Sequence, residues 1–423
     1  MHVKDPTRAP RRVVISGIGA ITPYGIGHEA LWSGLKSGRS AVRTLDRFDP
    51  SPFRTHVAAQ VNDFVPADHL EAKRARRLDR FGHFAVVAAL YAAADSGLEV
   101  AREDRSRIGA MMGSALGGIG YAEVQFARYL SEGVKSVDPL LALTVFAGSA
   151  SCNVAIEFGI SGPNSTNAMS CASGTMAIGE AMREIRAGRA DVMFAGGVEA
   201  PLFPLCFGSF SLIRAMSTRN LAPERASRPF DAARDGFVMA EGAVVLVLEE
   251  RARAVARGAP IYGELVGYGT TSDGSHMTAP RQDGREAARA MRLALEDAHL
   301  APHEVDYVNA HASSTPLNDP AETLAIRAAL GGIASIVPVS GTKGHHGHAL
   351  GATGAWEIAI SALALNRSWI PPTLNLELRD DACDLACVTG EGEERAMDVA
   401  ISNSFGFGGI NASIVLRREE WRC

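Results

Sequence analysis

The chain has 423 residues, of which 47% are hydrophobic and 21% are charged, and its formal net charge is −5. This composition is typical of a soluble enzyme with a sizeable core, and it gives no general reason to bind nucleic acid or an anionic membrane. No apolar run approaches the roughly 18 residues that a membrane-spanning helix needs.

Short apolar runs alternate with amphipathic stretches in the first part of the chain. Residues 76–97 carry apolar side chains at helical spacing, and Gly97 is the expected C-cap of that helix. The remaining runs are short and branched, as in strands that are buried on both faces. We therefore expect buried strands at residues 12–25, 107–118, 190–200 and 242–250.

The alternation of strands and glycine turns starts again after Arg257. IYGELVGYG predicts a strand, a helix follows from about Gly284 to His299, and VDYVNAHAS predicts a strand with a polar turn. DVAISNSFGFGG and NASIVLRRE complete the series. The whole pattern predicts an α/β chain with mixed sheets and no dividing linker.

Cysteine use and the N-terminus bear on the cellular compartment. Six cysteines in so long a chain do not suggest a disulfide framework, and the first residues lack the apolar core of a secretory signal. Cys383 and Cys387 have no second pair to complete a zinc site, so we interpret them as structural. We expect a cytoplasmic protein.

Cys171 stands among small residues in the stretch NAMSCASG. A short strand-like run precedes it, and a helical run that ends at Gly188 follows it. At a helix N-terminus the unpaired N–H groups favour a thiolate and can hold an oxyanion on the acyl group that it attacks. Small neighbours would leave the approach to the sulfur open. The alternative is a small buried hydrophobe without chemistry.

Two histidines stand in similarly small and polar surroundings. His311 lies in NAHASSTPLND after an apolar strand, and His348 lies in GTKGHHGHALGATGAWE before a helix. A lone histidine in such a place is more often structural, but two of them beside a candidate nucleophile favour catalysis. The histidine cluster also suggests a metal site, although no carboxylate or cysteine nearby completes the ligands. One or both of His345 and His346 are then expected to be exposed.

These motifs occur in one order along nearly the whole chain: VVISGIGAITPYG, MGSALGG, the Cys171 turn, RPFDAARDGFVMAEG, SDGSHMTAP, the two histidine motifs and SFGFGG. In this they resemble the elongating β-ketoacyl-acyl-carrier-protein synthases of the thiolase-like superfamily. The resemblance implies a five-layered αβαβα core of two similar halves with mixed sheets. Residues 1–258 would carry the nucleophile and residues 259–423 the two histidines. It also implies a homodimer.

The resemblance assigns catalytic roles to six residues. Cys171 matches the acyl-accepting nucleophile, and His311 and His348 match the catalytic histidines. Lys343 and Glu357 match a charged pair that we expect to fix His348. The remaining match is to a gating phenylalanine, whose backbone N–H joins that of the cysteine in the oxyanion hole; this is Phe407.

Further residues match substrate-binding positions. Ser313 and Thr315 match the hydroxyls that hold the phosphopantetheine arm, although NAHASST replaces the commoner NAHGTST. The alanine at position 312 is expected to tighten the pantetheine channel. The acyl tunnel and the rest of the substrate site are matched by Leu116, Phe210, Thr278 and Phe405.

The implied reaction is a decarboxylating Claisen condensation in fatty acid elongation. An acyl group on Cys171 condenses with malonyl-acyl-carrier protein to give a β-ketoacyl carrier, and no metal or organic cofactor takes part. The partner, acyl carrier protein, is acidic. The basic stretch AKRARRLDRF is a candidate docking site, in which Arg76 and Arg77 match the family's docking positions.

Several other functions are less well supported. A thiolase would need a second cysteine in a Cys-Gly-Gly context where FGFGG stands, and type III synthases use Cys, His and Asn. A non-catalytic chain-length subunit typically lacks the nucleophile. The alternative that stays open is the catalytic ketosynthase of a type II polyketide or aryl-polyene pathway, which uses the same residues.

Overall fold

A computed structural model describes residues 11–419 of the protein. The first ten residues, on which the expectation of no secretory signal mostly rests, lie outside the described residues. No helix within the described range is long and apolar enough to cross a membrane.

One hydrogen-bonded sheet of eleven strands runs through the molecule. Its main path has the order β11-β10-β14-β15-β9-β1-β8-β7-β5-β6, and β2 pairs with β1. The strands are β1 (Val13–Thr22), β2 (Gly25–Ile26), β5 (Ile108–Gly113), β6 (Asn164–Asn167), β7 (Val192–Glu199), β8 (Gly242–Glu250), β9 (Gly263–Ser272), β10 (Tyr307–Asn309), β11 (Val339–Ser340), β14 (Val399–Gly406) and β15 (Ile410–Arg417).

The two halves of this sheet repeat one pattern of strand directions. Along β1-β8-β7-β5-β6 the successive pairs are antiparallel, antiparallel, parallel and parallel. The path β9-β15-β14-β10-β11 has the same four pairings in the same order. The halves join where Val13, Val14 and Ile15 of β1 pair with β9. This repeat confirms the prediction of two similar halves. The boundary at residue 258 stays a prediction.

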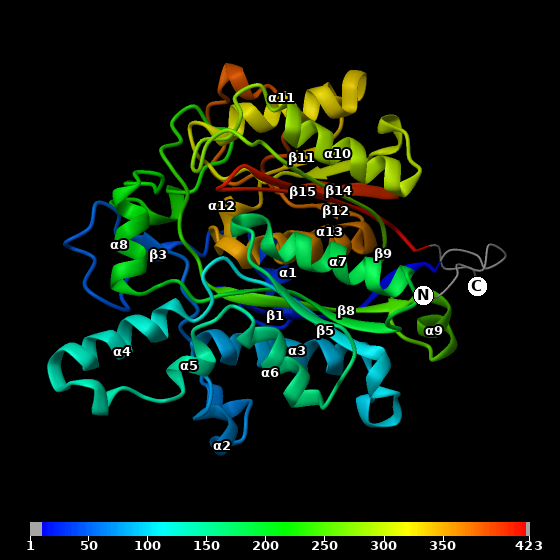
Figure 1. Cartoon of the computed structure of the whole chain (residues 1–423). Coiled ribbons are helices and arrows are strands. Elements are labelled where there is room, and N and C mark those ends of the chain that lie inside the picture. The colour runs from blue at the N-terminus through cyan, green and yellow to red at the C-terminus, as the bar shows by residue number, and fades with distance from the viewer. Residues whose placement is uncertain (1–10, 420–423) are drawn as a thin grey trace.

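Helices form three layers around the two half-sheets (Figure 1). One outer layer contains α3 and α6, the other contains α10 and α11, and α7 and α13 lie between the half-sheets. The predicted five-layered αβαβα core is therefore confirmed. The layer helices are α3 (Arg80–Ser96), α6 (Ser149–Phe158), α7 (Ser173–Arg186), α10 (Arg285–Ala298), α11 (Asn318–Leu330) and α13 (Thr353–Arg367).

The central position of α13 follows from its sequence. TGAWEIAISALALNR is apolar on nearly all sides, and every residue from Thr353 to Leu365 is buried. A helix without a polar face belongs inside the protein. The shorter elements are α1 (His28–Lys36), β3 (Arg43–Thr44), β4 (Val57–Ala58), α2 (Ala72–Ala75), α4 (Ile119–Glu132), α5 (Leu141–Thr144), α8 (Pro204–Leu212), α9 (Arg251–Ala256), α12 (Lys343–His346), β12 (Trp369–Ile370) and β13 (Glu393–Glu394).

The predicted helix over 76–97 begins later than expected. Asp79 caps α3 by accepting the Gly82 N–H, so the helix starts at Arg80. Its end is as predicted, because Gly97 adopts φ +63°, a left-handed conformation that suits glycine. The four buried strands predicted in the first part of the chain are confirmed as β1, β5, β7 and β8.

Candidate active site

Cys171 lies in a single 3₁₀ turn, Ser170–Ala172, between β6 and α7. Helix α7 begins at Ser173, so the predicted order of strand, cysteine and helix is confirmed. The small neighbours serve packing rather than access: Ala172, Ser173 and Gly174 are buried. A Cβ on Gly174 would lie 2.9 Å from the Gly351 carbonyl oxygen. The glycine therefore lets the N-termini of α7 and α13 approach each other closely.

Cys171 is buried, with 7% of the residue exposed. Burial raises its pKa, and this effect exceeds the opposing effects of the Ser170 hydroxyl, the Phe407 backbone N–H and the Lys343 ammonium. The Ser170 Oγ lies 3.7 Å from the sulfur. The resting group is consequently a thiol with several groups in place to stabilise the thiolate once the proton leaves.

His311 follows β10 and is held by Lys343. The Lys343 ammonium donates to the His311 carbonyl oxygen and lies 3.4 Å from His311 Nδ1. It also forms an ion pair with Glu357 at 2.5 Å, and both side chains are buried. Because an ammonium group has only donors, Nδ1 accepts and the ring proton of His311 lies on Nε2.

His348 is held by a different group. Its Nδ1 lies 2.9 Å from the Thr353 hydroxyl, on the first residue of α13. The expectation that Lys343 and Glu357 fix His348 is therefore wrong, because their contacts are with His311. The reason is that a lysine side chain is long enough to cross to a neighbouring strand end. Sequence spacing gave no sign of Thr353.

The two imidazole rings meet edge to face. Their centroids are 5.3 Å apart with an interplanar angle of 81°. Burial, followed by the nearby Lys343 charge, lowers the pKa of His311 and of His348 well below the usual value. Both rings are thus neutral at neutral pH and each carries one N–H donor. Burial also raises the pKa of Glu357, and the Lys343 ammonium that pairs with it opposes this effect.

A cavity of about 250 Å³ connects these groups to the surface. Leu116 and Phe210 do not line it and pack instead into an adjoining apolar cluster with Leu350 and Phe237. Lys343 and Glu357 do not line the cavity either. The predicted site residues that do line the cavity are Cys171, Thr278, His311, Ser313, Thr315, His348, Phe405 and Phe407.

The loop after β14 closes one side of the cavity. Phe407 directs its backbone N–H toward Cys171, and its ring stacks on Phe210 with the centroids 6.4 Å apart. The loop is tied to the segment after β9, since Gly408 N–H donates to the Met277 carbonyl oxygen at 2.7 Å. Phe407 therefore separates the cavity at Cys171 from the apolar cluster beyond.

Family models match most of the chain. The model of the Beta-ketoacyl synthase, N-terminal domain, matches residues 10–254, and that of the C-terminal domain matches residues 262–377. The chain belongs to the β-ketoacyl synthase family. The synthase is 44% identical to the 3-oxoacyl-[acyl-carrier-protein] synthase 2 of Synechocystis sp., over 96% of this chain and 98% of that relative. The corresponding protein of Coxiella burnetii is 43% identical over 96% of this chain and 99% of the relative.

Solved structures agree with this placement. A β-ketoacyl synthase from Burkholderia phymatum matches with a TM-score of 0.89 and 38% identity, covering 97% of this chain and all (100%) of that one. A type II polyketide ketosynthase, solved with its acyl-carrier protein and a hexaketide, matches with a TM-score of 0.90 and 35% identity over the same shares. The predicted family, fold and condensing enzyme class are confirmed.

The NAHASST loop of the synthase differs from expectation at one position. Ser313 and Thr315 place their hydroxyl oxygens 2.9 Å apart at the cavity wall. Ala312 adopts φ +41° and points into the apolar cluster of the second half, outside the cavity. The expectation that it tightens the pantetheine channel is therefore wrong. The buried Glu322, which sequence reasoning missed, accepts the N–H groups of His311 and Ala312 at 2.7 Å each.

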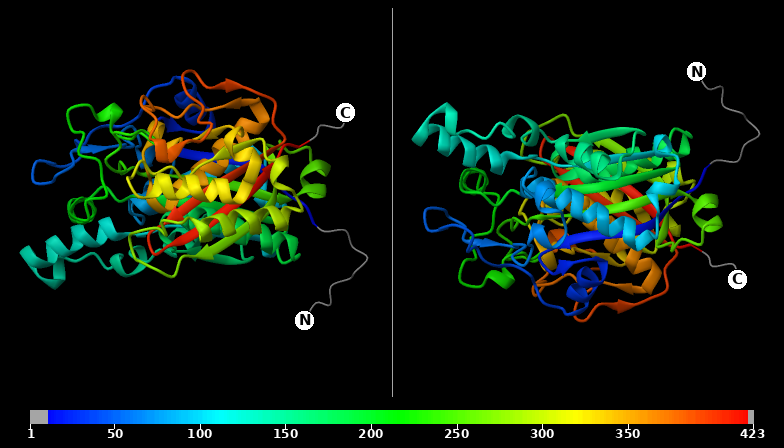
Figure 2. Two further views of the ribbon diagram at one scale, coloured as in Figure 1. Left: turned by 90° about the horizontal axis from the view of Figure 1, so that it is seen from above. Right: turned by 90° about the horizontal axis from the view of Figure 1, so that it is seen from below.

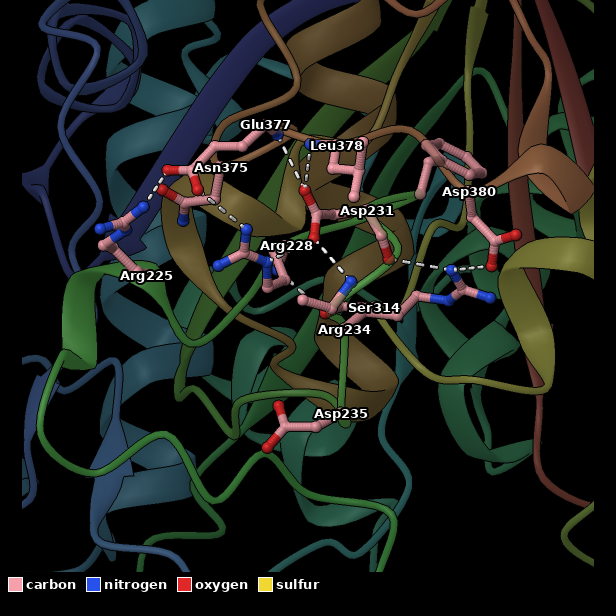
Figure 3. A network of polar contacts seen from close by, with 12 residues as sticks. Arg225, Arg228, Asp231, Arg234, Asp235, Ser314, Asn375, Glu377, Leu378 and Asp380 are labelled. Atoms are coloured by element: carbon pink, nitrogen blue, oxygen red, sulfur yellow. Dashed lines mark hydrogen bonds and ion pairs between the residues drawn. The ribbon is translucent and has the colours of Figure 1, made fainter.

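A buried ionic network supports this loop of the synthase from behind (Figure 3). Arg234 donates from Nε to the Thr315 carbonyl oxygen at 3.0 Å and pairs with Asp380 at 2.7 Å. Asp231 accepts from Arg228 Nε at 2.8 Å and from two backbone N–H groups of the 377–378 segment. The stretch RPFDAARDG thus holds the Ser313–Thr315 loop in place. Sequence reasoning assigned it no such role, although its charges beside turn residues were a signal that could have done so.

The other histidines of GHHGH are buried in the synthase. His345 Nε2 lies 2.8 Å from the Pro372 carbonyl oxygen, and His346 Nδ1 lies 2.8 Å from the Gly347 carbonyl oxygen. Both side chains have no exposed surface. The expectation that one or both are exposed is wrong, because α12 lies in the interior next to α13.

The basic stretch before α3 separates into two groups. Arg76 and Arg77 are exposed between α2 and α3. Arg80 is instead partly buried and pairs with the fully buried Glu241 at 2.8 Å. The exposed basic surface of this stretch therefore consists of Arg76 and Arg77, which match docking positions, and of Lys73.

Proposed function

We propose that the protein condenses an acyl group carried on Cys171 with malonyl-acyl-carrier protein and releases a β-ketoacyl carrier. One observation carries this proposal: the thiol and the two neutral histidines line one cavity that opens to the surface. Transthioesterification loads the acyl group onto the sulfur, and the resting thiol passes its proton on as the carrier thiol leaves.

The histidines serve the decarboxylation of the malonyl group. Loss of carbon dioxide leaves an enolate, whose oxygen is stabilised by N–H donors in a water-poor site. His311 offers Nε2–H because Lys343 occupies its Nδ1. His348 is the main donor, with its ring oriented by Thr353. His311 shares this role and acts as acid or base toward water at the departing carboxylate.

The carbon–carbon bond forms at the thioester on Cys171. The carbanion attacks the acyl carbonyl, and the oxyanion accepts the backbone N–H groups of Cys171 and Phe407. The approach of the Phe407 N–H to the sulfur supports this assignment. Collapse of the tetrahedral intermediate expels the thiolate and releases a product two carbons longer than the acyl group.

The substrates arrive on phosphopantetheine, and the enzyme itself needs no metal or organic cofactor. Ser313 and Thr315 hold the arm at the cavity wall. Phe407 opens toward Phe210 and Leu116, whose apolar cluster receives the acyl chain, while Thr278 and Phe405 complete the lining. The acidic acyl carrier protein docks on Arg76 and Arg77, which lie exposed on the surface.

The working enzyme is a homodimer in the cytoplasm. Strand β6 is the last strand of the sheet path, and within residues 11–419 its outer edge has no neighbouring strand. An uncovered edge strand is a site for pairing with a second chain. Helix α4 stands out from the body (Figure 2). Exposed apolar side chains lie on α4, on α5, on α6, and just after α5 and β6; they are Phe126, Leu143, Ile156, Phe146 and Met169.

Fatty acid elongation is the favoured pathway, since the curated relatives at 41–44% identity carry the name 3-oxoacyl synthase 2. A type II polyketide ketosynthase is the second candidate, favoured by the structural match at 35% identity. Incubation with acyl and malonyl carriers, followed by mass analysis of the products, separates the two. One two-carbon extension per turnover supports elongation, and repeated extension without reduction supports the polyketide pathway. Absence of any condensed product would refute both.

A further inference from the structure

Glu199, the last residue of β7, carries a buried carboxylate that the proposed reaction does not use. Four donors converge on it. Oε1 accepts the Ser114 hydroxyl at 2.9 Å and the Leu116 N–H at 3.1 Å. Oε2 accepts the Ala115 N–H at 2.7 Å and the Gly351 N–H at 2.9 Å. Such a set of charge-assisted bonds holds backbone segments firmly.

The donors come from two turns in different halves of the chain. Ser114, Ala115 and Leu116 follow β5, whereas Gly351 lies three residues after His348. A Cβ on Gly351 would be 2.3 Å from the Ala115 nitrogen, so the turns touch through their backbones. Within the second turn Leu350 adopts φ +45°, a left-handed conformation that a residue other than glycine keeps only where its surroundings hold it.

Both turns border the acyl side of the site. Leu350 lines the cavity at Cys171, and it packs with Leu116 and Phe210 in one apolar cluster. We infer that Glu199 is a positioning residue that fixes the Leu116 turn against the His348 turn and so links acyl-chain selection to the geometry of the histidine. This inference rests on the proposed function.

Glu199→Gln keeps the size of the side chain but not its acceptors. A glutamine has one acceptor oxygen and one NH₂ group. With the NH₂ toward Ala115 and Gly351, two backbone bonds are lost. With the NH₂ toward Ser114 and Leu116, the Leu116 bond is lost, because the hydroxyl can turn and accept while the backbone N–H cannot. Loosening a turn next to a reacting group by a fraction of an ångström is expected to lower kcat about tenfold. Because the tunnel wall moves with it, the ratio of rates for long and short acyl carriers is expected to change as well.

The experiment measures kcat and KM of condensation across a series of acyl carriers for the wild type and the Glu199→Gln variant. Glu249→Gln is the matched control, because this carboxylate is also fully buried on a neighbouring strand but pairs with Arg253 and Arg257 away from the cavity. We expect a lower kcat and an altered chain-length ratio for Glu199→Gln alone, with an unchanged KM for the malonyl carrier. An unaltered ratio, or an equal alteration in the control, overturns the inference.

Ser114→Ala covers the case in which Glu199→Gln does not fold. It removes one donor and little volume, and we expect the chain-length ratio to change in the same direction by a smaller factor. An unchanged ratio in folded Ser114→Ala overturns the inference in that case. A wild type without condensing activity would refute the proposed function instead, so the two failures are distinguishable.

Discussion

The buried pair of Lys343 and Glu357 gives a prediction whose size follows from the structure. Within the described residues, Lys343 is the sole hydrogen-bond partner of the Glu357 carboxylate, because Oε2 has none. Lys343→Met leaves that carboxylate buried without a cation. Breaking such a pair from one side typically costs about 3–5 kcal/mol of the free energy of unfolding. Burial already raises the pKa of Glu357, and loss of the ammonium is expected to raise it further.

Catalysis is expected to fall for a separate reason. Without the ammonium, nothing fixes the proton of His311 on Nε2, and the donor to the enolate is lost in part of the molecules. We expect malonyl decarboxylation by the folded Lys343→Met variant to drop about 100-fold. Adding Glu357→Gln removes the unpaired acid, so about 2 kcal/mol of stability is expected to return without the activity.

Urea unfolding and a carbon dioxide release assay on the three proteins test this account. The wild type, the single variant and the double variant are compared at one pH. If Lys343→Met unfolds at the same urea concentration as the wild type, the reasoning on the ion pair is refuted. If the double variant recovers decarboxylation, the role of Lys343 in fixing the His311 proton is refuted.

Three further predictions concern chain length, docking and pH. Leu116→Phe should slow the acylation of Cys171 by long acyl carriers by a factor of tens or more and leave that by short carriers unchanged. The reason is that each methylene group kept out of the tunnel loses about 0.8 kcal/mol of binding free energy from burial. A uniform loss at all chain lengths would place Leu116 outside the tunnel. Replacing Arg76 and Arg77 by Glu should raise the KM for acyl carrier protein and reduce the salt dependence of that KM, with little effect on free pantetheine substrates. An equal loss of activity with carrier-bound and free substrates would show that the two arginines have a structural role. Burial lowers the pKa of His345 from 6.5 to about 4 and that of His346 from 6.5 to about 3. Below pH 6.5 the unfolded chain therefore binds more protons than the folded chain, so the free energy of unfolding should decrease from pH 6.5 toward pH 4. Replacing both histidines by Gln should reduce this dependence on pH, as measured by urea titrations. An unchanged dependence would contradict the burial of the two histidines.

The sequence carries the signals that are local. Apolar runs of strand length predicted the core strands, and small residues around Cys171 predicted a turn before a helix. Glycine at position 97 predicted a helix end through its left-handed backbone conformation. Each of these follows from a few neighbouring residues, so no knowledge of distant contacts was needed.

Contacts between distant segments were not predictable in this way. Lys343 contacts His311 rather than His348, and the hydroxyl of Thr353 contacts His348 instead. The direction of a side chain across two strand ends depends on the packing of both halves, which no spacing encodes. The same holds for the four donors on Glu199, which come from turns more than 80 residues away from it.

Mass mapping after incubation with acyl-loaded acyl carrier protein identifies the atom that accepts the acyl group. We expect the acyl group on Cys171 and no adduct in a folded Cys171→Ala variant. Cys152 is exposed and serves as an internal control for nonspecific acylation. An acyl group mapped to Cys152 or Cys206 instead, or continued transfer by Cys171→Ala, would show that Cys171 is not the nucleophile.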